Sequence, residues 1–329
     1  MSASKNRPRW NELPERVRGQ IEYLVAGRVV AAENCDGGFS PGFASRLTLA
    51  GGRRVFVKAI DAVSWPDQAP IYRDETQVAA GLAAARAEDA GVAAAVSTPR
   101  FLGSLDDGRF VILAFDCVAG GEPARPWRLA ELTRVAAAVG RMSAALTPSP
   151  LALPADHPRI GGWAELAADG PALARLRTMS PWSARHLDQL IAAERRGLAA
   201  AMGTALVHFD VLPHNILLTC AQVTVVDWPH ARLGAPVIDL VMVLASGAAD
   251  GIDPDPLLQA QPAATAVDDA DVTDVLAALT GFWLAGALEP MPPGLGPIAA
   301  AKLHLGRGAL WWLQRRLGAT STASSRRSC

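Results

Sequence analysis

The sequence predicts an α+β protein with two lobes. The first lobe would contain a mixed or antiparallel sheet of five strands with one main helix, and the second would be mainly helical. Two observations support this. Segments with the period of strands crowd into the first third of the chain, and alanine-rich segments with helical spacing follow. In addition, 329 residues, half of them hydrophobic, are too many for one simple core. We expect an N-terminal lobe over residues 1–118, a C-terminal lobe over 119–329 and a disordered tail from about residue 318.

Composition excludes several classes of protein. The formal net charge of −1 indicates neither nucleic acid nor an acidic membrane surface as a partner. The four cysteines lack metal-like spacing, which is typical of free thiols in a reducing cytosol. No signal-like apolar region stands near residue 1, and the longest apolar run, Val272 to Leu288, is interrupted by Asp274. We therefore expect a cytoplasmic protein without a membrane span, as a monomer or weak dimer.

The first elements of the N-terminal lobe surround a glycine-rich loop. A helix is expected over 14–25, and strands over 29–35 and 43–49 flank the loop. Glycines allow close approach of the backbone, and free N–H groups in such a loop can cradle a phosphate. An ordinary hairpin loop would have the same composition, and Pro41 contributes no N–H. The candidate nucleotide-binding residues here are Gly37, Gly38, Ser40 and Gly42.

Two charged residues stand where apolar residues are expected. Lys58 lies within the predicted strand 53–60, on one face with Phe56 and Ile60. Glu75 lies on the apolar stripe of a helix predicted over 71–85. Buried charges are rare unless they are paired, so we expect Lys58 and Glu75 to form an ion pair. The alternative is an edge strand from which Lys58 reaches water.

The remaining segments complete both lobes. Strands over 96–105 and 110–114 finish the sheet, and the chain then passes Asp116 and Val118 before Gly120 and Gly121. Long helices follow over 129–146, 183–200, 272–288 and 298–317, whereas 147–182 gives no clear prediction.

A hairpin with polar residues at its open end is the most informative segment. Residues 216–219 and 223–226 are β-prone, and only three residues separate them. In an antiparallel hairpin the start of the first strand lies beside the end of the second. Asn215 and Asp227 are therefore expected to lie together. An amide oxygen and a carboxylate are hard ligands that Mg²⁺ accepts alongside phosphate oxygens.

A second carboxylate precedes this hairpin. Asp210 stands five residues before Asn215, just after an apolar run. It could accept a proton from an attacking hydroxyl, which would complete a phosphoryl-transfer site. The alternative is that Asp210 and Asn215 cap turns and that Asp227 merely ends a strand.

The pattern His208-x-Asp210-x4-Asn215, followed by Asp227-Trp228, resembles the catalytic loop and metal-binding Asp of the aminoglycoside phosphotransferase family. The resemblance extends over roughly 36–245. It implies a two-lobed protein-kinase-like fold and an ATP-dependent transfer of the γ-phosphoryl group to a hydroxyl of a small molecule. The acceptor would be aminoglycoside-like or another metabolite.

The resemblance also implies roles for individual residues. Asp210 would act as the catalytic base, and Asn215 and Asp227 would hold Mg²⁺. Lys58 would contact the ATP phosphates, with Glu75 orienting it. Backbone groups at Asp116 and Val118 would bind the edge of the adenine ring. His208 and Asp239 would support the catalytic loop.

Departures from protein kinases favour a small-molecule kinase. Only 12 residues lead from Asp227 to Asp239, which is too short for a phosphorylated activation loop. Phe209 replaces the Arg that binds the loop phosphate in many protein kinases, and Pro229 stands at the position of a glycine. A nucleotide-binding module without catalysis is the other alternative, although its expected sign, loss of the base or a metal ligand, is absent.

An acidic stretch over 250–274 allows two interpretations. In the resembled family such segments of the C-terminal lobe bind cationic acceptors, so the acceptor here could be cationic. The alternative is a solvated loop with helix caps, because Asp-Pro steps favour turns. The aspartates concerned are Asp250, Asp253, Asp255, Asp268, Asp269, Asp271 and Asp274.

Overall fold

The computed structural model describes residues 7–35, 40–154, 159–265, 267–289 and 296–326. The chain divides into two compact units. The N-terminal unit comprises Met1–Pro123 and His214–Ala231, and the C-terminal unit comprises Ala124–Pro213 and Arg232–Cys329.

The N-terminal unit is built on one sheet of five strands. Its order is β1-β2-β3-β5-β4, and all neighbouring strands are antiparallel. The predicted sheet is thereby confirmed. Because β3 lies at the centre, Lys58 is not on an edge strand. The strands are β1 (Val29–Asn34), β2 (Phe43–Leu49), β3 (Arg54–Asp61), β4 (Phe101–Asp106) and β5 (Phe110–Asp116).

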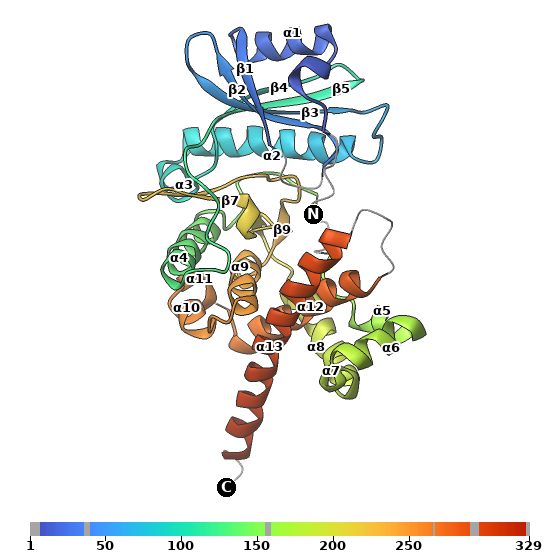
Figure 1. Ribbon diagram of the computed structural model, residues 1–329. Coiled ribbons are helices and arrows are strands. Elements are labelled where there is room, and N and C mark those ends of the chain that lie inside the picture. The colour runs from blue at the N-terminus through green and yellow to red at the C-terminus, as the bar shows by residue number, and fades with distance from the viewer. Residues whose placement is uncertain (1–6, 36–39, 155–158, 266, 290–295, 327–329) are drawn as a thin grey trace. The chain divides into compact units, whose positions relative to one another are not determined.

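One helix covers each face of this sheet, α1 (Glu15–Leu24) and α2 (Ala69–Glu88), as Figure 1 shows. Alternation along β3 explains the arrangement. Val55 and Val57 are buried in the cluster that contains two α1 residues, whereas Ile60 packs in the cluster with Tyr72 of α2. Each fully buried side chain of this kind contributes roughly 1.5–3 kcal/mol. Two short helices, the 3₁₀ helix η1 (Trp10–Glu12) and α3 (Ala90–Ala95), complete this part of the chain.

The predicted hairpin forms β7 (Ile216–Leu218) and β8 (Val223–Val225), after the 3₁₀ helix η2 (Pro213–Asn215). It belongs to the N-terminal unit, although the sequence analysis placed all residues after 118 in the second lobe. Backbone hydrogen bonds explain the difference. Gly121 and Leu218 exchange two bonds of 3.1 and 2.8 Å, and the Val225 N–H donates to the Ser97 carbonyl at 2.9 Å.

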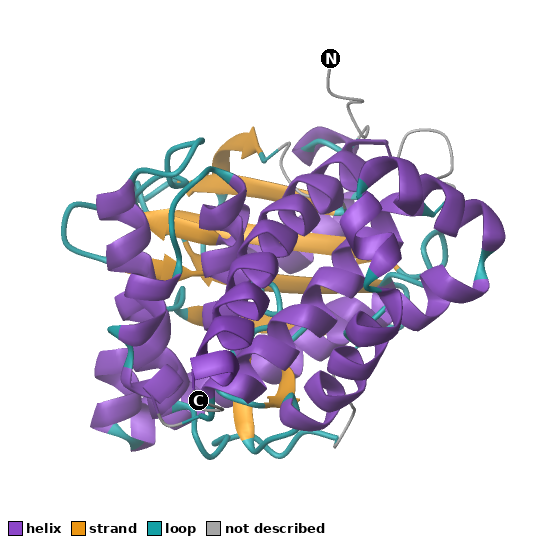
Figure 2. Ribbon diagram, turned by 90° about the horizontal axis from the view of Figure 1, so that it is seen from below, coloured by secondary structure: helices purple, strands orange, loops and turns teal. Residues whose placement is uncertain are grey.

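The C-terminal unit is mostly helical (Figure 2). One small two-stranded sheet, β6 (Ala205–Val207) with β9 (Arg232–Gly234), accompanies the helices. The predicted helix over 183–200 is interrupted at His186. The helices are α4 (Leu129–Ala145), α5 (Trp163–Ala168), α6 (Gly170–Met179), α7 (Pro181–Arg185), α8 (Leu187–Ala200), α9 (Ile238–Ala249), α10 (Asp255–Gln259), α11 (Pro262–Thr265), α12 (Asp269–Leu288) and α13 (Gly296–Arg326).

Helix α12 forms much of the core of this unit and packs against α13. By length and composition α12 could cross a membrane, but 78% of its most apolar window is buried, and it packs against α8 and α13. It is therefore a core helix. Helix α13 continues to Arg326, and the expected disorder of the tail from about residue 318 stays a prediction.

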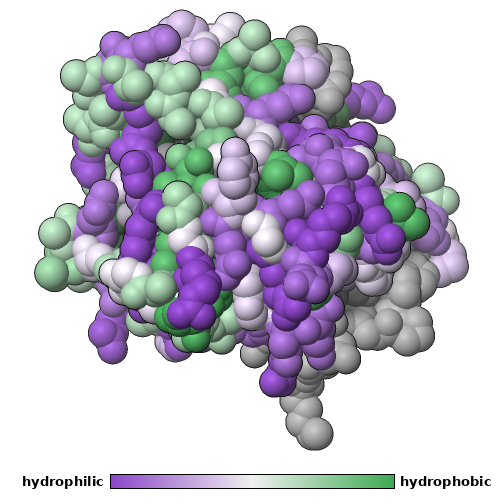
Figure 3. Space-filling model, turned by 90° about the horizontal axis from the view of Figure 1, so that it is seen from above, coloured by the Kyte–Doolittle hydropathy of each residue, from purple (hydrophilic) through white to green (hydrophobic). Residues whose placement is uncertain are grey.

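Exposed apolar side chains of the N-terminal unit are dispersed. The space-filling view shows hydrophilic and hydrophobic residues interspersed on one face (Figure 3). Tyr23, Val30, Val63 and Trp65 are exposed, and they come from separate segments of the unit. Scattered apolar residues of this kind are normal on a protein surface.

Candidate active site

Lys58 lies at the centre of a cluster of three charges in the N-terminal unit. Its Nζ is 2.5 Å from Oε2 of Glu75, so the predicted ion pair between β3 and α2 is confirmed. The same Nζ also donates to the carboxylate of Asp227, which follows β8. This second partner was not predicted, because 169 residues separate it from Lys58 in sequence.

Burial and charge compete within this cluster. The side chains of Lys58 and Glu75 are 12% and 4% exposed, whereas that of Asp227 is 44% exposed. Burial alone would lower the pKa of Lys58, but Asp227 and Glu75 outweigh it and raise that pKa above its usual value. Burial raises the pKa of Glu75, and the charge of Lys58 opposes this. Lys58 is therefore a permanent cation, and Asp227 is its more accessible partner.

Glu75 also connects α2 to the segment after β8. The backbone of Trp228 hydrogen-bonds the Glu75 carboxylate. The Trp228 ring is buried, and its Nε1 donates to the Val225 carbonyl at 3.3 Å. Between these contacts, Asp227 has a φ of +67°, which is unusual for a residue other than glycine. The contacts of Trp228 thus restrain the backbone that carries Asp227.

Asn215 and Asp227 are at the same end of the hairpin, as predicted. Ile216 pairs with Val225, and the Val226 N–H donates to the Asn215 carbonyl at 2.9 Å. Asn215 is buried, which restricts its side chain. An amide and a carboxylate suit Mg²⁺, which keeps other positions for phosphate oxygens and water. Among the described residues no group of three or more His, Cys, Asp or Glu could form an all-protein metal site.

Ser97 is a supporting residue that the sequence analysis missed. Its Oγ lies 3.0 Å from Oγ1 of the buried Thr224 and accepts from Gln222 Nε2 at 2.8 Å. Together with the bond from Val225 to the Ser97 carbonyl, these contacts attach β8 to the segment before β4. The polar contacts of Ser97 hold β8, the strand that precedes Asp227.

The glycine-rich loop is described only in part, because Gly37 and Gly38 lie outside the described residues. The Ser40 hydroxyl is 2.6 Å from that of Tyr72 and accepts from the Gly42 N–H at 3.2 Å. A Cβ on Gly42 would lie 2.5 Å from the Ala59 carbonyl oxygen, so packing already requires glycine there. The phosphate-binding role of Ser40 and Gly42 stays a prediction.

Arg7 braces the residues on both sides of this loop. Its Nη1 donates to the Cys35 carbonyl at 2.8 Å, and its Nε donates to the Ser40 carbonyl at 3.0 Å. The sequence analysis missed this contact because Arg7 lies in a polar stretch without periodicity, far from both partners.

Asp116 ends β5, and its carboxylate forms ion pairs with Arg53 at 2.9 Å and Arg100 at 2.6 Å. Its N–H donates to the Arg100 carbonyl at 2.9 Å. This N–H is therefore already used within the protein. Val118 follows in the loop and is half-buried. The adenine-binding role of Asp116 and Val118 stays a prediction.

The first part of the predicted catalytic loop, from His208 to Asp210, belongs to the C-terminal unit and is organised by a buried carboxylate. Asp239, in the first turn of α9, accepts the N–H of His208 and that of Phe209, both at 2.8 Å. Burial raises the pKa of Asp239. The Asp210 N–H donates to His208 Nδ1 at 3.2 Å. The predicted supporting contacts of His208 and Asp239 are confirmed, and the catalytic role of Asp210 stays a prediction.

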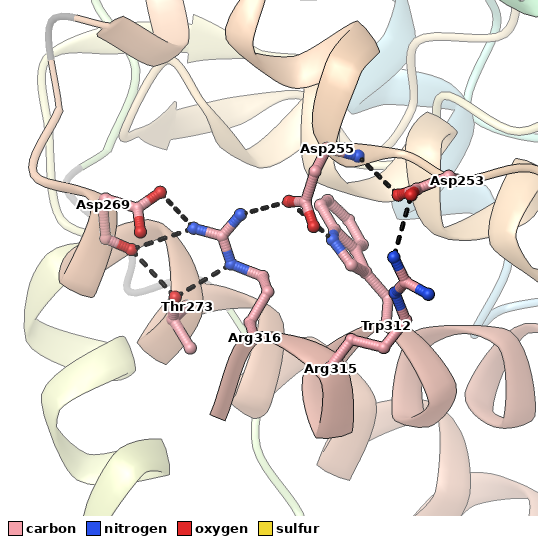
Figure 4. A network of polar contacts seen from close by, with 7 residues as sticks. All are labelled: Asp253, Asp255, Asp269, Thr273, Trp312, Arg315 and Arg316. Atoms are coloured by element: carbon pink, nitrogen blue, oxygen red, sulfur yellow. Dashed lines mark hydrogen bonds and ion pairs between the residues drawn. The ribbon is translucent and has the colours of Figure 1, made fainter. Parts of the chain in front are cut away.

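Carboxylates of the acidic stretch bind residues of α13 (Figure 4). Arg316, only 7% exposed, donates to Asp255 at 2.5 Å and also pairs with Asp269. Trp312 Nε1 donates to Asp255 at 3.0 Å, and Arg315 donates to Asp253 at 2.9 Å.

Other aspartates of the stretch bind groups elsewhere in the C-terminal unit. Asp274 forms a bidentate pair with Arg196 at 2.6 and 2.8 Å, and Asp250 accepts the Trp127 N–H at 2.7 Å. Asp268 caps α12 by accepting the Ala270 N–H. Many carboxylates of the acidic stretch thus form ion pairs with arginines or accept backbone N–H groups. This arrangement favours a structural role for the stretch over binding of a cationic acceptor.

A comparison with models of protein families identifies one family. A model of the phosphotransferase enzyme family matches residues 36–278. No protein of curated function matches the sequence.

Several solved structures share the fold at low sequence identity. An aminoglycoside phosphotransferase from Alicyclobacillus acidocaldarius is 16% identical, with a TM-score of 0.54 over 89% of this chain and 93% of that chain. A spectinomycin phosphotransferase in complex with ADP and spectinomycin is 10% identical, with a TM-score of 0.56 over 90% and 97%. An amicoumacin kinase in complex with AMP-PNP, Ca²⁺ and its ligand is 10% identical, with a TM-score of 0.54 over 90% and 94%. The two-lobed kinase-like fold is thereby confirmed.

Proposed function

Because this chain belongs to the phosphotransferase enzyme family, we propose that it transfers the γ-phosphoryl group of ATP to a hydroxyl group of a small molecule. The observation that carries the proposal is the cluster of Lys58, Glu75 and Asp227 in the N-terminal unit. A buried cation with two carboxylates is costly for stability alone, but it suits a site that receives phosphates. The nucleotides in the spectinomycin phosphotransferase and amicoumacin kinase structures support ATP as the donor.

Each residue of the site has a defined role in this proposal. Lys58 contacts the phosphates, and Glu75 holds its ammonium in place. Phosphate oxygens replace the more exposed Asp227 as the second partner of Lys58 when the nucleotide binds. The loop residues Gly37, Gly38, Ser40 and Gly42 have the role of binding the phosphates, and the backbone at Asp116 and Val118 contacts adenine.

Asn215 and Asp227 are the residues that would hold Mg²⁺, which supplies neutralisation of phosphate charge when bound. Asp210 orients the acceptor hydroxyl and accepts its proton as the oxygen–phosphorus bond forms. ADP leaves with the electron pair of the broken bond. Catalysis of this type depends mainly on positioning and electrostatic stabilisation, so this set of residues is sufficient in kind.

Two alternatives receive less support. A nucleotide-binding module without catalysis would gain little from Asp210, since Lys58, Asn215 and Asp227 already serve the nucleotide. A protein kinase would need a longer segment than the 12 residues that lead from Asp227 to Asp239.

The proposal is tested by measuring ATP consumption with a panel of hydroxyl-bearing acceptors, namely aminoglycosides, macrolides, amino alcohols and sugars. We expect one class to stimulate turnover. In Asp210→Asn, transfer should fall by roughly two orders of magnitude or more. Mg-ATP affinity, measured by calorimetry, should stay within a few-fold of wild type. Wild-type protein that binds Mg-ATP but phosphorylates no acceptor would favour the binding module, and full activity in Asp210→Asn would refute its catalytic role.

A further inference from the structure

Phe209, which immediately precedes Asp210, has a strained backbone. Its φ of +64° lies in the left-handed region, where residues with a Cβ are uncommon. Such a conformation costs on the order of 1–3 kcal/mol and persists only where surrounding contacts enforce it. Asp239 supplies one such contact by accepting the Phe209 N–H. This bond restrains the backbone of Phe209 and does not involve its ring.

Arg232 provides that restraint within the same C-terminal unit. The guanidinium Cζ lies 4.7 Å from the centroid of the Phe209 ring, well within the range of a cation–π contact. Arg232 is the first residue of β9 and pairs directly with Val207, the last residue of β6. The small β6–β9 sheet therefore places the guanidinium over a residue only two positions beyond the end of β6. Phe209 is 8% exposed and Arg232 is half-buried, so water is kept from much of the contact, which strengthens it.

We propose that Arg232 is a positioning residue, which acts through the Phe209 ring to hold the catalytic loop in the left-handed turn that presents Asp210. The inference rests on the proposed phosphotransferase function for its effect on catalysis. Its structural part, restraint of the loop by the contact, stands on the geometry alone. A hydrogen bond at the Phe209 N–H and a cation over its ring together leave the residue before Asp210 little freedom.

A double-mutant cycle tests the contact. Arg232→Met removes the cation but keeps an unbranched chain, and Phe209→Leu removes the π-system but stays apolar. Arg232 has other contacts as well, so the coupling between the two variants, not either alone, isolates the ring contact. Arg315→Met is a matched control, because the Arg315 guanidinium lies 5.0 Å from the Trp311 ring, on α13.

We expect kcat for acceptor phosphorylation to fall about 3- to 10-fold in Arg232→Met, with KM for ATP unchanged, since the nucleotide residues belong to the other unit. Arg232→Lys should recover part of kcat. Arg232→Met in the Phe209→Leu background should have little further effect, and Arg315→Met should match wild type.

Hydrogen–deuterium exchange of the peptide spanning 205–213 supplies a readout that needs no acceptor. Arg232→Met should accelerate exchange there by about 3-fold or more, and Arg315→Met should not. Equal exchange in wild type and Arg232→Met, or strictly additive effects in the cycle, would overturn the proposal. If wild type phosphorylates no acceptor while exchange responds as expected, the phosphotransferase function fails and the positioning of the loop stands.

Discussion

The two halves of the proposed site are held in place by different forces. In the N-terminal unit, Lys58, Glu75 and Asp227 are held by one another's charge. In the C-terminal unit, the loop before Asp210 is held by neutral N–H groups that donate to one buried carboxylate, Asp239. In the first arrangement Lys58 can exchange a carboxylate partner for a phosphate oxygen when a polyanion binds. The hydrogen bonds of the second arrangement do not depend on a bound anion. This difference suits a half that binds a charged nucleotide and a half that must keep a base in position.

The largest effect is expected at the exposed member of the charge cluster. Asp227→Asn should lower Mg-dependent ATP turnover by about 100-fold or more, because an amide binds Mg²⁺ and neutralises Lys58 poorly. The melting temperature of the ligand-free protein should change little, since Glu75 still pairs with Lys58. Asp253→Asn is the control, because Asp253 is 43% exposed against 44% for Asp227 and also forms an ion pair. Unaltered turnover in Asp227→Asn would contradict the metal assignment.

A cycle on the buried pair tests whether the charges act as a unit. Lys58→Ala and Glu75→Ala should each lower kcat/KM by about 10- to 100-fold, because the first leaves the buried Glu75 without its cation and the second leaves Lys58 only the exposed Asp227. The double variant should lose less than the product of the two single effects. Arg73 and Asp106, an exposed pair at 2.7 Å that also starts from α2, should show no such coupling in turnover. Independent effects of Lys58 and Glu75 would mean that their contact has no part in catalysis.

The hydrogen-bonded half is tested at Asp239. Asp239→Asn replaces one acceptor oxygen by an NH₂ group that faces a backbone N–H. We expect the free energy of unfolding to fall by about 2–3 kcal/mol, as measured by urea denaturation, together with a loss of kcat. Asp268→Asn removes a carboxylate that accepts one N–H at the exposed start of α12, and it should cost at most about 1 kcal/mol. Equal losses for the two variants would show that Asp239 acts only as a helix residue.

The smallest effect is expected at Asp107, a charge of the N-terminal unit outside the cluster. Hydrogen bonds from the Phe110 backbone and Gln20 lower the pKa of Asp107 to about 2. Its carboxylate therefore contributes stability that is complete above about pH 4 and is lost as the pH falls toward 2. At pH 7, Asp107→Asn should lower the free energy of unfolding by about 1 kcal/mol, and the difference from wild type should shrink below pH 4.

Turnover is the control for this last variant. Asp107→Asn should leave kcat at pH 7 unchanged, because Asp107 joins α1 to the turn before β5 and lies outside the charge cluster. A stability difference that persists to pH 2 would contradict the assigned pKa.

The sequence by itself determined the elements whose signals are local. The two-residue period of β3 placed Lys58 on the face of Ile60, and the spacing of α2 placed Glu75 on the buried stripe, so their pairing could be predicted from two misplaced charges. The short turn between 216–219 and 223–226 determined that Asn215 and Asp227 share one end of a hairpin. Each inference used only geometry that repeats within a few residues.

Only the tertiary structure decided which distant groups meet. The contact between Lys58 and Asp227, the Ser97 contacts with β8 and the attachment of Arg7 beside the loop join segments that no periodicity relates. The sequence allows the acidic stretch to bind a cationic acceptor or to form a solvated loop with helix caps, yet arginines of α13 pair with several of its carboxylates. Phe209 gives no sign of its left-handed backbone, because strain is imposed from outside the residue by Asp239 and Arg232. Such contacts depend on how complete helices and strands pack together, and a local sequence pattern does not predict that packing.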